Sequence, residues 1–413
     1  MAVQAEATTV NGHCDERFAE VAHELRKSFS ERGELGASVA VTVGGEPVVD
    51  LWGGWADPER RTPWGENTVA VMMSCTKGAT ALCAHMLAVE GLLDFDQRVT
   101  AYWPEFAAAG KEDVLVRHVL CHQAGLPAIR TPLEPGAFFD WDTVVGVLAA
   151  EEPWWTPGSA YGYHGFTYGF LVGELVRRVT GTPMRDFFRT EVAEPLGLDL
   201  WMGLPESELG RVARVQPPPP PAPGEPVAPW LVKAMTDPGS MQALMIGNTG
   251  GYFLPGEWDS PAALQAVIPA AGGVGNARAL ATMYRAIVHD RKVGRVSFEP
   301  EDVARMGTVC SALGQDQMLL APGRWALGFM KGGVSPRGVE PPARVVLSET
   351  AFGHIGHGGS IGFADPACGL SFGYVMNQMD PDQGLSDKAQ SMIDATYRAL
   401  GYSSAMHGTW VRP

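Results

Sequence analysis

Ser74 and Lys77 are the residues of this chain whose types and spacing most directly suggest chemistry. If the chain is helical from residue 74 to about 90, residues three apart share a face and the Lys77 amine lies beside the Ser74 hydroxyl. A serine hydroxyl is a weak nucleophile unless a neighbouring base takes its proton. The spacing also fits a solvated polar pair on an exposed helix, but apolar runs at 69–73 and 79–84 favour a pair buried at the start of a core helix. A buried lysine must be paired or lose its proton, so the two residues are a candidate nucleophile and base.

Two glycine-containing segments further along the chain, the first of them a turn-rich loop, could complete such a site. In the first, at 157–165, Tyr163 held near Lys77 would have its phenolate favoured by the ammonium, which makes it a candidate second base and later an acid. A tyrosine in a loop is otherwise usually a packing residue. In the second, at 352–360, glycines let the backbone approach a ligand and offer an N–H group to an oxyanion. The Ser74 N–H, at the start of its helix, would be the other donor.

Two alternative sites compete with the interpretation that Ser74, Lys77 and Tyr163 form the site. Residues 358–362 fit the Gly-x-Ser-x-Gly nucleophile elbow, with Asp365 or Asp380 and then His407 in the order serine, acid, histidine. An elbow requires a strand, a sharp turn and a helix, whereas 363–369 resembles a turn that leads into a strand, so we disfavour it. Histidines at 118 and 122, and at 354 and 357, resemble metal pairs but have no carboxylate at ligand spacing. A structural role is favoured for them.

The elements that must position these residues suggest an α+β fold. An opening helix at 16–32 precedes a hairpin of strands at 37–43 and 47–52, and the part after residue 275 returns to strands and closes with a helix. Strands at both chain ends predict one antiparallel sheet flanked by helices, with an inserted, mostly helical domain. The predicted domains are 1–75 with 275–413, and 76–274, the latter with a proline-rich loop at about 216–226. The remaining predicted helices are 77–91, 114–121, 141–151, 166–180, 184–195, 276–289 and 386–400, and the remaining strands are 324–330, 343–349 and 370–377.

Composition indicates an ordinary soluble globular protein. The chain has 413 residues, 46% hydrophobic residues and a formal net charge of -15, which argues against nucleic acid or anionic membrane as a partner. No secretory signal or membrane span is apparent, so the predicted location is cytoplasmic. The six scattered cysteines fit reduced thiols. Cys75 is a weaker candidate nucleophile than Ser74, because the lysine spacing points to the serine.

Taken in order, these motifs resemble the serine β-lactamase and penicillin-binding-protein superfamily, in the branch of class C β-lactamase-like carboxylesterases called family VIII esterases. The resemblance covers about residues 16 to 400. Ser74-x-x-Lys77 matches the first motif. Residues 117–127 are similar to a Leu-Leu-x-His-x-x-Gly-Leu stretch, Tyr163 takes the catalytic tyrosine position of the second motif, and 357–360 fall where the third motif lies on the edge strand.

The resemblance implies a role for each of these residues. Ser74 is the expected nucleophile, Lys77 and Tyr163 share the acid and base roles, and the backbone N–H groups of Ser74 and Ser360 stabilise the tetrahedral oxyanion. No metal or cofactor is implied. The expected reaction is cleavage of short-chain carboxylic esters through a covalent acyl-Ser74 intermediate.

The chain departs from the β-lactamase pattern at two motifs. Tyr163-His164-Gly165 stands where those enzymes carry Tyr-x-Asn, and His357-Gly358-Gly359 stands where they carry Lys-Thr-Gly. Loss of the amide and the cation weakens the expectation of β-lactam recognition, and the esterase branch shows such replacements. His357, Gly358 and Gly359 are therefore predicted to contact an ester substrate.

The substrate and the acyl acceptor stay open. Trp155 is predicted to contact substrate, as part of an apolar wall that could exclude water or hold an acyl chain, although such residues are most often core: Trp154, Trp155, Trp230, Met235, Met241 and Met245. The partner is expected to be a small ester or acyl compound, and the motifs carry no information on oligomeric state. Alternatives are acyl transfer to an amine or alcohol, a β-lactamase or D-Ala peptidase-like activity, and a sensor that acylates without turnover.

Overall fold

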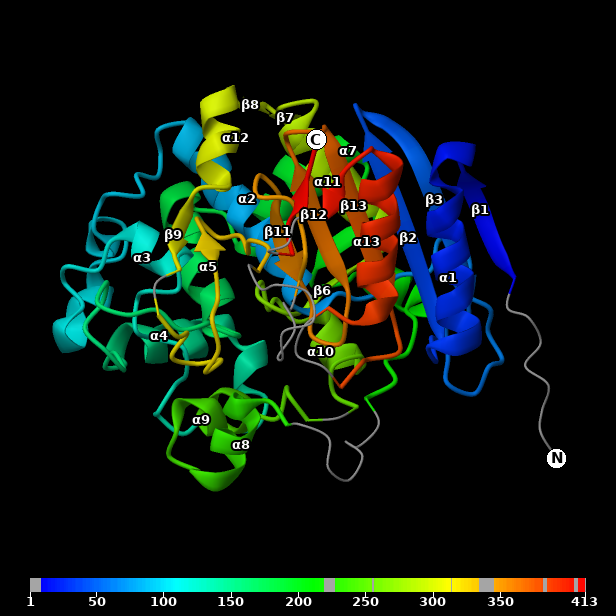
Figure 1. The fold of residues 1–413 in the computed structure, drawn as a ribbon. Helices are drawn as coiled ribbons and strands as arrows, with labels where there is room; N and C mark the ends of the chain where they lie inside the picture. Colours follow the sequence, from blue (N-terminus) through cyan, green and yellow to red (C-terminus); the bar gives the residue numbers. More distant parts are fainter. Residues whose placement is uncertain are drawn as a thin grey trace.

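The computed structural model of the chain describes residues 9–218, 227–254, 256–312, 314–333, 345–381, 385–404 and 408–412. Its largest sheet has six antiparallel strands. Figure 1 shows that they come from both ends of the chain, with the blue N-terminal strands beside the orange C-terminal ones. The strands, in spatial order, are β1 (Val10–Cys14), β3 (Glu46–Gly54), β2 (Gly36–Val43), β13 (Leu370–Met376), β12 (Ile361–Asp365) and β11 (Phe352–Ile355). This arrangement confirms the predicted α+β fold class.

Helices cover both faces of this sheet. On one face lie α1 (Ala19–Glu31) and α13 (Asp387–Ala399), and on the other lies α11 (Ala277–Val288). Glycines bring α11 close to the sheet, because a Cβ at Gly373 would lie 2.2 Å from the Ala277 carbonyl oxygen. α11 therefore packs on the middle strands β2 and β13 and on the neighbouring β12.

The middle of the chain is mostly helical. Its central helix, α2 (Thr76–Val89), is buried on all sides over most of its length and packs against α5 (Thr167–Thr180). The other helices are α3 (Val116–Leu120), α4 (Trp141–Ala150), α6 (Met184–Phe188), α7 (Glu194–Leu196), α8 (Pro229–Thr236), α9 (Met241–Gly247), α10 (Pro261–Gln265) and α12 (Pro300–Met306). The burial of α2 agrees with the prediction that residue 74 precedes a core helix.

Short strands and 3-10 turns connect these elements. One small sheet joins β4 (Ala70–Val71), β6 (Gly273–Gly275) and β5 (Leu200–Met202), and pairs form between β7 (Lys292–Val293) and β8 (Val296–Ser297), β9 (Val309–Ser311) and β10 (Trp325–Ala326), and β14 (Ser403–Ser404) and β15 (Trp410–Val411). The 3-10 turns are Glu16–Phe18, Met73–Cys75, Val99–Ala101, Pro104–Gly110, Ala137–Phe139 and Glu206–Arg211, and Arg189–Ala193 is a π-turn. No helix in the described ranges is long and apolar enough to cross a membrane.

Several predicted elements were wrong. No strands were predicted at 352–355 and 361–365, where β11 and β12 form; their glycines reduce strand propensity but let neighbouring segments approach closely. The strand predicted at 324–330 is limited to β10, and residues 345–349 form only an isolated bridge. By contrast, the helix predicted at 184–195 is confirmed, because α6, the π-turn and α7 follow one another without a break.

Ser360 lies between two strands, which contradicts the strand, turn and helix of a nucleophile elbow. His407, the histidine of the serine, acid and histidine set in that alternative, lies outside the described residues. Of the proline-rich loop at 216–226, only 216–218 is described, and Gln216 forms a bridge with Gln378 there.

The expectation of six reduced cysteines was wrong for two of them. Cys121, directly after α3, forms a disulfide with Cys310 in β9, with a Cα–Cα distance of 6.1 Å. The two residues are 189 positions apart, so their spacing gives no sign of the pairing. Cys14, Cys75, Cys83 and Cys368 are free thiols.

Candidate active site

The structure brings Ser74, Lys77 and Tyr163 together. Ser74 lies in the 3-10 turn before α2, and Lys77 lies in the first turn of that helix, so the Lys77 Nζ is 3.1 Å from the Ser74 Oγ. The Tyr163 hydroxyl comes from the loop before α5 and donates a hydrogen bond of 2.7 Å to the same Oγ. Met73 has a φ of 48°, which is unusual for a residue with a side chain and sets the turn that presents Ser74. The serine oxygen therefore lies between an amine and a phenol.

The surroundings of Lys77 favour a neutral amine. Its side chain is buried, and Nζ lies 2.7 Å from the Gly165 carbonyl oxygen and 2.9 Å from the Ala270 carbonyl oxygen. Burial holds the pKa of Lys77 well below its usual range. A neutral amine has two N–H bonds and one lone pair, and carbonyl oxygens only accept hydrogen bonds. With both N–H bonds directed at carbonyls, the lone pair is left for the Ser74 hydroxyl proton.

Tyr163 is held in its protonated form. Burial raises the pKa of its hydroxyl, and the hydrogen bond to Ser74 opposes this only in part. The Lys77 Nζ lies 4.7 Å from the centre of the tyrosine ring. The expected ammonium and phenolate pair is therefore replaced by a neutral amine and a neutral phenol, because a buried site disfavours both charges.

Two residues that the sequence analysis did not single out hold Tyr163 in place. The buried carboxylate of Asp316 accepts the Tyr163 backbone N–H at 3.0 and 3.1 Å, and the Trp325 ring stacks on the Tyr163 ring with centres 5.1 Å apart. Both follow Tyr163 by at least 150 residues, so no local spacing connects them to it. His164 points into the protein, where its Nε2 accepts the Leu126 N–H at 3.0 Å.

The Ser360 segment lies against the turn that carries Ser74. The Cys75 thiol donates to the His354 carbonyl oxygen of β11 at 3.4 Å, and a Cβ at Gly356 would lie 2.3 Å from the Met72 carbonyl oxygen. Among the described residues, the backbone N–H groups of Ser74 and Ser360 have no hydrogen-bond acceptor. Both N–H groups are therefore available to an external oxygen atom.

The third-motif residues follow the edge strand β11 in its turn to β12, rather than lying on the strand as expected. Gly358 and Gly359 have φ values of 92° and 124°, which favour glycine. The His357 ring lies 5.7 Å from that of Phe253 and 6.1 Å from that of Trp258. Burial lowers the pKa of His357 to about 4, so its imidazole is uncharged at neutral pH.

The predicted apolar wall is only partly present at the site. Met245 packs against Gly165, where a Cβ would lie 2.7 Å from its Sδ. Trp155 packs against His164 at a ring distance of 6.1 Å, on the loop that carries Tyr163. Trp230 is buried in the protein, and Met235 is 75% exposed. Met235 and Trp230 therefore do not share one surface with Trp155 and Met245.

No group of three or more His, Cys, Asp or Glu side chains within the described ranges is arranged to hold a metal ion. The two histidines of the 118 and 122 pair have separate surroundings. His118 Nδ1 accepts the Leu115 N–H at 3.3 Å, whereas the His122 ring packs against that of Tyr163 at 5.2 Å. His122 therefore belongs to the packing around the tyrosine.

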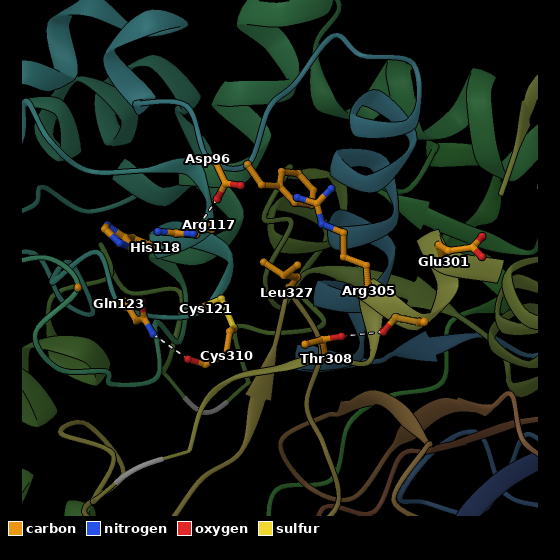
Figure 2. Close-up of a pocket in the computed structure, with 13 residues that line it drawn as sticks. Asp96, Arg117, His118, Cys121, Gln123, Glu301, Arg305, Thr308, Cys310 and Leu327 are labelled. Carbon is orange, nitrogen blue, oxygen red and sulfur yellow. Dashed lines mark hydrogen bonds and ion pairs between the residues drawn. A yellow bond between two sulfur atoms is a disulfide. The ribbon is translucent and has the colours of Figure 1, made fainter. Parts of the chain in front are cut away.

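A separate cavity of about 780 Å³ lies beside the disulfide, as Figure 2 shows. The residues that line it include Cys121, Cys310, Arg117 and Arg305, and Ser74, Lys77 and Tyr163 are not among them. Two of the charged side chains that line it bind each other, because Arg117 forms an ion pair of 2.8 Å with Asp96. This cavity is distinct from the candidate active site.

Comparisons with known proteins agree with the geometry. A family model described as Beta-lactamase matches residues 18–397. The chain is 36% identical over 391 residues to "Esterase/beta-lactamase LipL" of Mycobacterium tuberculosis, which covers 92% of this chain and 86% of that protein. Its structure is similar to that of a family VIII carboxylesterase, with 35% identity, a TM-score of 0.81 and coverage of 95% of this chain and 100% of the other. A penicillin-binding-protein homologue from Caulobacter crescentus gives 38% identity, the same TM-score of 0.81 and the same coverage of 95% and 100%.

Proposed function

Because this chain belongs to the beta-lactamase family, we propose that it is a carboxylesterase that cleaves short-chain esters through an acyl-Ser74 intermediate. The observation that carries the proposal is the position of the Ser74 Oγ, 3.1 Å from the Lys77 amine and 2.7 Å from the Tyr163 hydroxyl. An activated serine needs a base within hydrogen-bond reach and a proton donor for the leaving group. The two neighbours of Ser74 supply one of each.

In the acylation step, the Ser74 Oγ attacks the ester carbonyl carbon while its proton passes to the lone pair of Lys77. The carbonyl oxygen becomes an oxyanion, which the N–H groups of Ser74 and Ser360 stabilise. Tyr163 then gives its proton to the leaving alcohol oxygen, and the Lys77 ammonium returns a proton to the phenolate. The acyl group is left on Ser74, and the net products are the acyl-enzyme and the alcohol.

In the deacylation step, water attacks the acyl carbon from the side that the alcohol has left. The Lys77 and Tyr163 pair takes a proton from this water, and the Ser74 oxygen recovers a proton as the acid departs. The proton that left with the alcohol is replaced by one from water, so Ser74, Lys77 and Tyr163 each end the cycle in their starting protonation state. It uses side chains and backbone N–H groups alone.

The charges around the site favour a neutral ester over a β-lactam carboxylate. His357 is uncharged and stands among aromatic rings, so it offers no fixed cation to an anionic substrate. Gly165 offers no side-chain amide, and Met245 occupies the space that a side chain there would need. β-Lactam hydrolysis is the second candidate, because the relative LipL is named both esterase and beta-lactamase.

The molecule that accepts the acyl group from Ser74 decides between a hydrolase and a transacylase. Water makes the protein a hydrolase, and an amine or alcohol would make it a transacylase with the same acyl-enzyme. The absence of turnover would make it a sensor. Retention of both Lys77 and Tyr163 beside Ser74 favours turnover.

The test uses p-nitrophenyl acetate and butyrate, a chromogenic cephalosporin, and mass spectrometry of the protein after mixing. We expect release of p-nitrophenol, an added acyl mass at Ser74, and ester turnover that exceeds cephalosporin turnover. Added amine changes the products only if acyl transfer operates. The variant S74A should form no adduct, whereas S360A retains its backbone N–H and should still be labelled at Ser74. Labelling that is lost in S360A but kept in S74A would refute the proposal.

The location and the partners stay predictions. A disulfide between Cys121 and Cys310 favours an oxidising compartment over the predicted cytoplasm, because cytosolic reductants keep thiols reduced. The expected partner is a small ester or acyl compound, without nucleic acid or membrane.

A further inference from the structure

Asp316 is a fully buried carboxylate surrounded by N–H donors. Its Oδ1 accepts the backbone N–H groups of Met318 and Leu319, each at 2.9 Å, and its Oδ2 accepts the indole N–H of Trp325 at 3.2 Å. Both oxygens also accept the Tyr163 N–H, at 3.0 and 3.1 Å. Every polar neighbour is a donor, which fits an ionised carboxylate because a protonated one would direct its own O–H at an N–H group.

The chain around Asp316 closes on the loop of Tyr163 at several further points. The Tyr161 hydroxyl donates to the carbonyl oxygens of Gly314 and Gly323 at 3.1 and 3.2 Å, and the Gln317 N–H donates to the Tyr161 carbonyl oxygen at 2.9 Å. From α9, the Gln242 amide donates to the Gln317 carbonyl oxygen at 2.8 Å. These bonds hold Asp316 at a fixed place relative to residue 163.

Trp325 contacts both Asp316 and the Tyr163 ring, so it links the carboxylate that binds the Tyr163 backbone to the position of the phenol ring. The indole N–H is bound to Asp316, while the indole ring stacks on the Tyr163 ring with an interplanar angle of 11°. The opposite end of the phenol reaches the Ser74 Oγ at 2.7 Å. One carboxylate therefore fixes both the main chain of the tyrosine and the aromatic surface that sets the plane of its ring.

We propose that Asp316 is a positioning residue that, through the Tyr163 N–H and through Trp325, holds the Tyr163 hydroxyl on the Ser74 oxygen. The inference rests on the proposed function, since it assigns Asp316 a role in the acid chemistry of that site. Asp316 touches neither Ser74 nor Lys77, so it acts only through the tyrosine. Burial is the main cause that raises the pKa of Tyr163, and the Asp316 charge adds to it, which keeps the phenol protonated.

The test is a double-mutant cycle between D316N and Y163F. An asparagine would direct its NH2 group at N–H donors, so the tyrosine loop should shift while the side-chain volume is preserved. We expect D316N to lower kcat for p-nitrophenyl butyrate by about 100-fold with little change in KM, the loss typical of a small misplacement of a catalytic group. In the Y163F background, D316N should change kcat by less than about 2-fold, because the group it positions is already gone.

A matched control is D365N. Asp365 is also fully buried and accepts hydrogen bonds from the Tyr397 hydroxyl at 3.0 Å and the Ala367 N–H at 3.1 Å, but it does not contact Tyr163. Both asparagine variants should lower the melting temperature, and D316N alone should lower kcat in a way that depends on Tyr163. A loss of kcat in D316N that multiplies with that of Y163F would overturn the proposal, as would an unchanged kcat in D316N.

If D316N does not fold, W325F replaces it in the double-mutant cycle with Y163F. It removes only the indole N–H donor and keeps an aromatic ring over Tyr163, so we expect a loss of kcat smaller than that of D316N and absent in the Y163F background. A loss that persists in that background would overturn the proposal. Acyl labelling separates the two hypotheses: no adduct on Ser74 in the unsubstituted chain refutes the esterase mechanism, whereas multiplicative effects with the Ser74 adduct present refute only the role of Asp316.

Discussion

Replacing Lys77 by methionine tests whether this lysine is a neutral base. Methionine has a similar length and is apolar, so K77M removes the lone pair that faces the Ser74 Oγ at 3.1 Å with little change in volume. General base catalysis contributes about 10²- to 10⁴-fold to rates. We expect K77M to lose at least about 100-fold in kcat/KM for p-nitrophenyl butyrate.

The same substitution should leave the stability near its starting value. At pH 8, holding a lysine neutral costs about 3 kcal/mol, since each pH unit below its unfolded pKa of about 10.4 costs about 1.4 kcal/mol. K77M removes this cost but leaves the Gly165 and Ala270 carbonyl oxygens without a donor, at about 1–3 kcal/mol each. The two effects are similar in size and opposite in sign. A large loss of activity should therefore come with a small change in the free energy of unfolding.

The dependence of stability on pH gives a second readout with a definite sign. The pKa of Lys77 is lowered in the folded state, so at pH values between its folded and unfolded pKa the unfolded chain binds one more proton than the folded chain. Its contribution makes the free energy of unfolding rise with pH in that window, by up to about 1.4 kcal/mol per unit, and K77M should lack this slope. The slope is measured by urea unfolding between pH 7 and 9.

A buried lysine elsewhere provides the control for this experiment. Lys111 is also buried, and its Nζ donates to the Ala108 carbonyl oxygen at 2.7 Å rather than to a residue of the candidate site. K111M should change stability without changing kcat by more than a few fold. If K77M keeps more than a tenth of the original kcat/KM, or keeps the full pH slope of stability, the assignment of Lys77 as a neutral base is wrong.

The other predictions concern the acid, the disulfide and one glycine. Y163F should lower the acylation rate by about 10²- to 10⁴-fold in a rapid-mixing assay while leaving the melting temperature almost unchanged, and an unchanged rate would exclude Tyr163 as the acid. The double variant C121S/C310S should lose about 2–5 kcal/mol of unfolding free energy, and dithiothreitol should reproduce this in the unsubstituted chain only. G356A should lower both activity and stability, by about 1–3 kcal/mol for the latter, because its Cβ would lie 2.3 Å from a backbone oxygen beside the nucleophile turn. The matched control G146A, where a Cβ meets no atom within 4 Å inside α4, should be stabilising by about 0.5–1 kcal/mol in thermal unfolding, and equal effects of the two would contradict the close approach.

The features that could be predicted from the sequence are those with a local signal. Helical spacing connects Ser74 to Lys77, and apolar flanks place both at the head of a buried helix. The hairpin of β2 and β3 is recognisable because two β-rich runs flank a glycine turn. Strands predicted at both chain ends indicate the sheet, and the order of the motifs along the chain indicates the family.

The features that could not be predicted depend on contacts between distant segments. Asp316 lies 153 positions after Tyr163, and the disulfide joins residues 189 apart, so no periodicity or spacing marks either pair. β11 and β12 were missed because their glycines are unfavourable in isolated strands. In the folded chain these glycines are needed, since a Cβ at Gly362 would lie 2.8 Å from the Tyr284 ring of α11.

In the proposed mechanism, the hydrogen-bond partners of the Ser74 Oγ among the described residues are an amine and a phenol rather than a carboxylate. A base must be uncharged before it can take the serine proton, and burial imposes this on Lys77 through the cost of desolvating an ammonium. Carbonyl oxygens of Gly165 and Ala270 then orient the amine without adding a charge. In the proposed function, the uncharged imidazole of His357 and the protonated phenol of Tyr163 both favour an uncharged ester as the substrate.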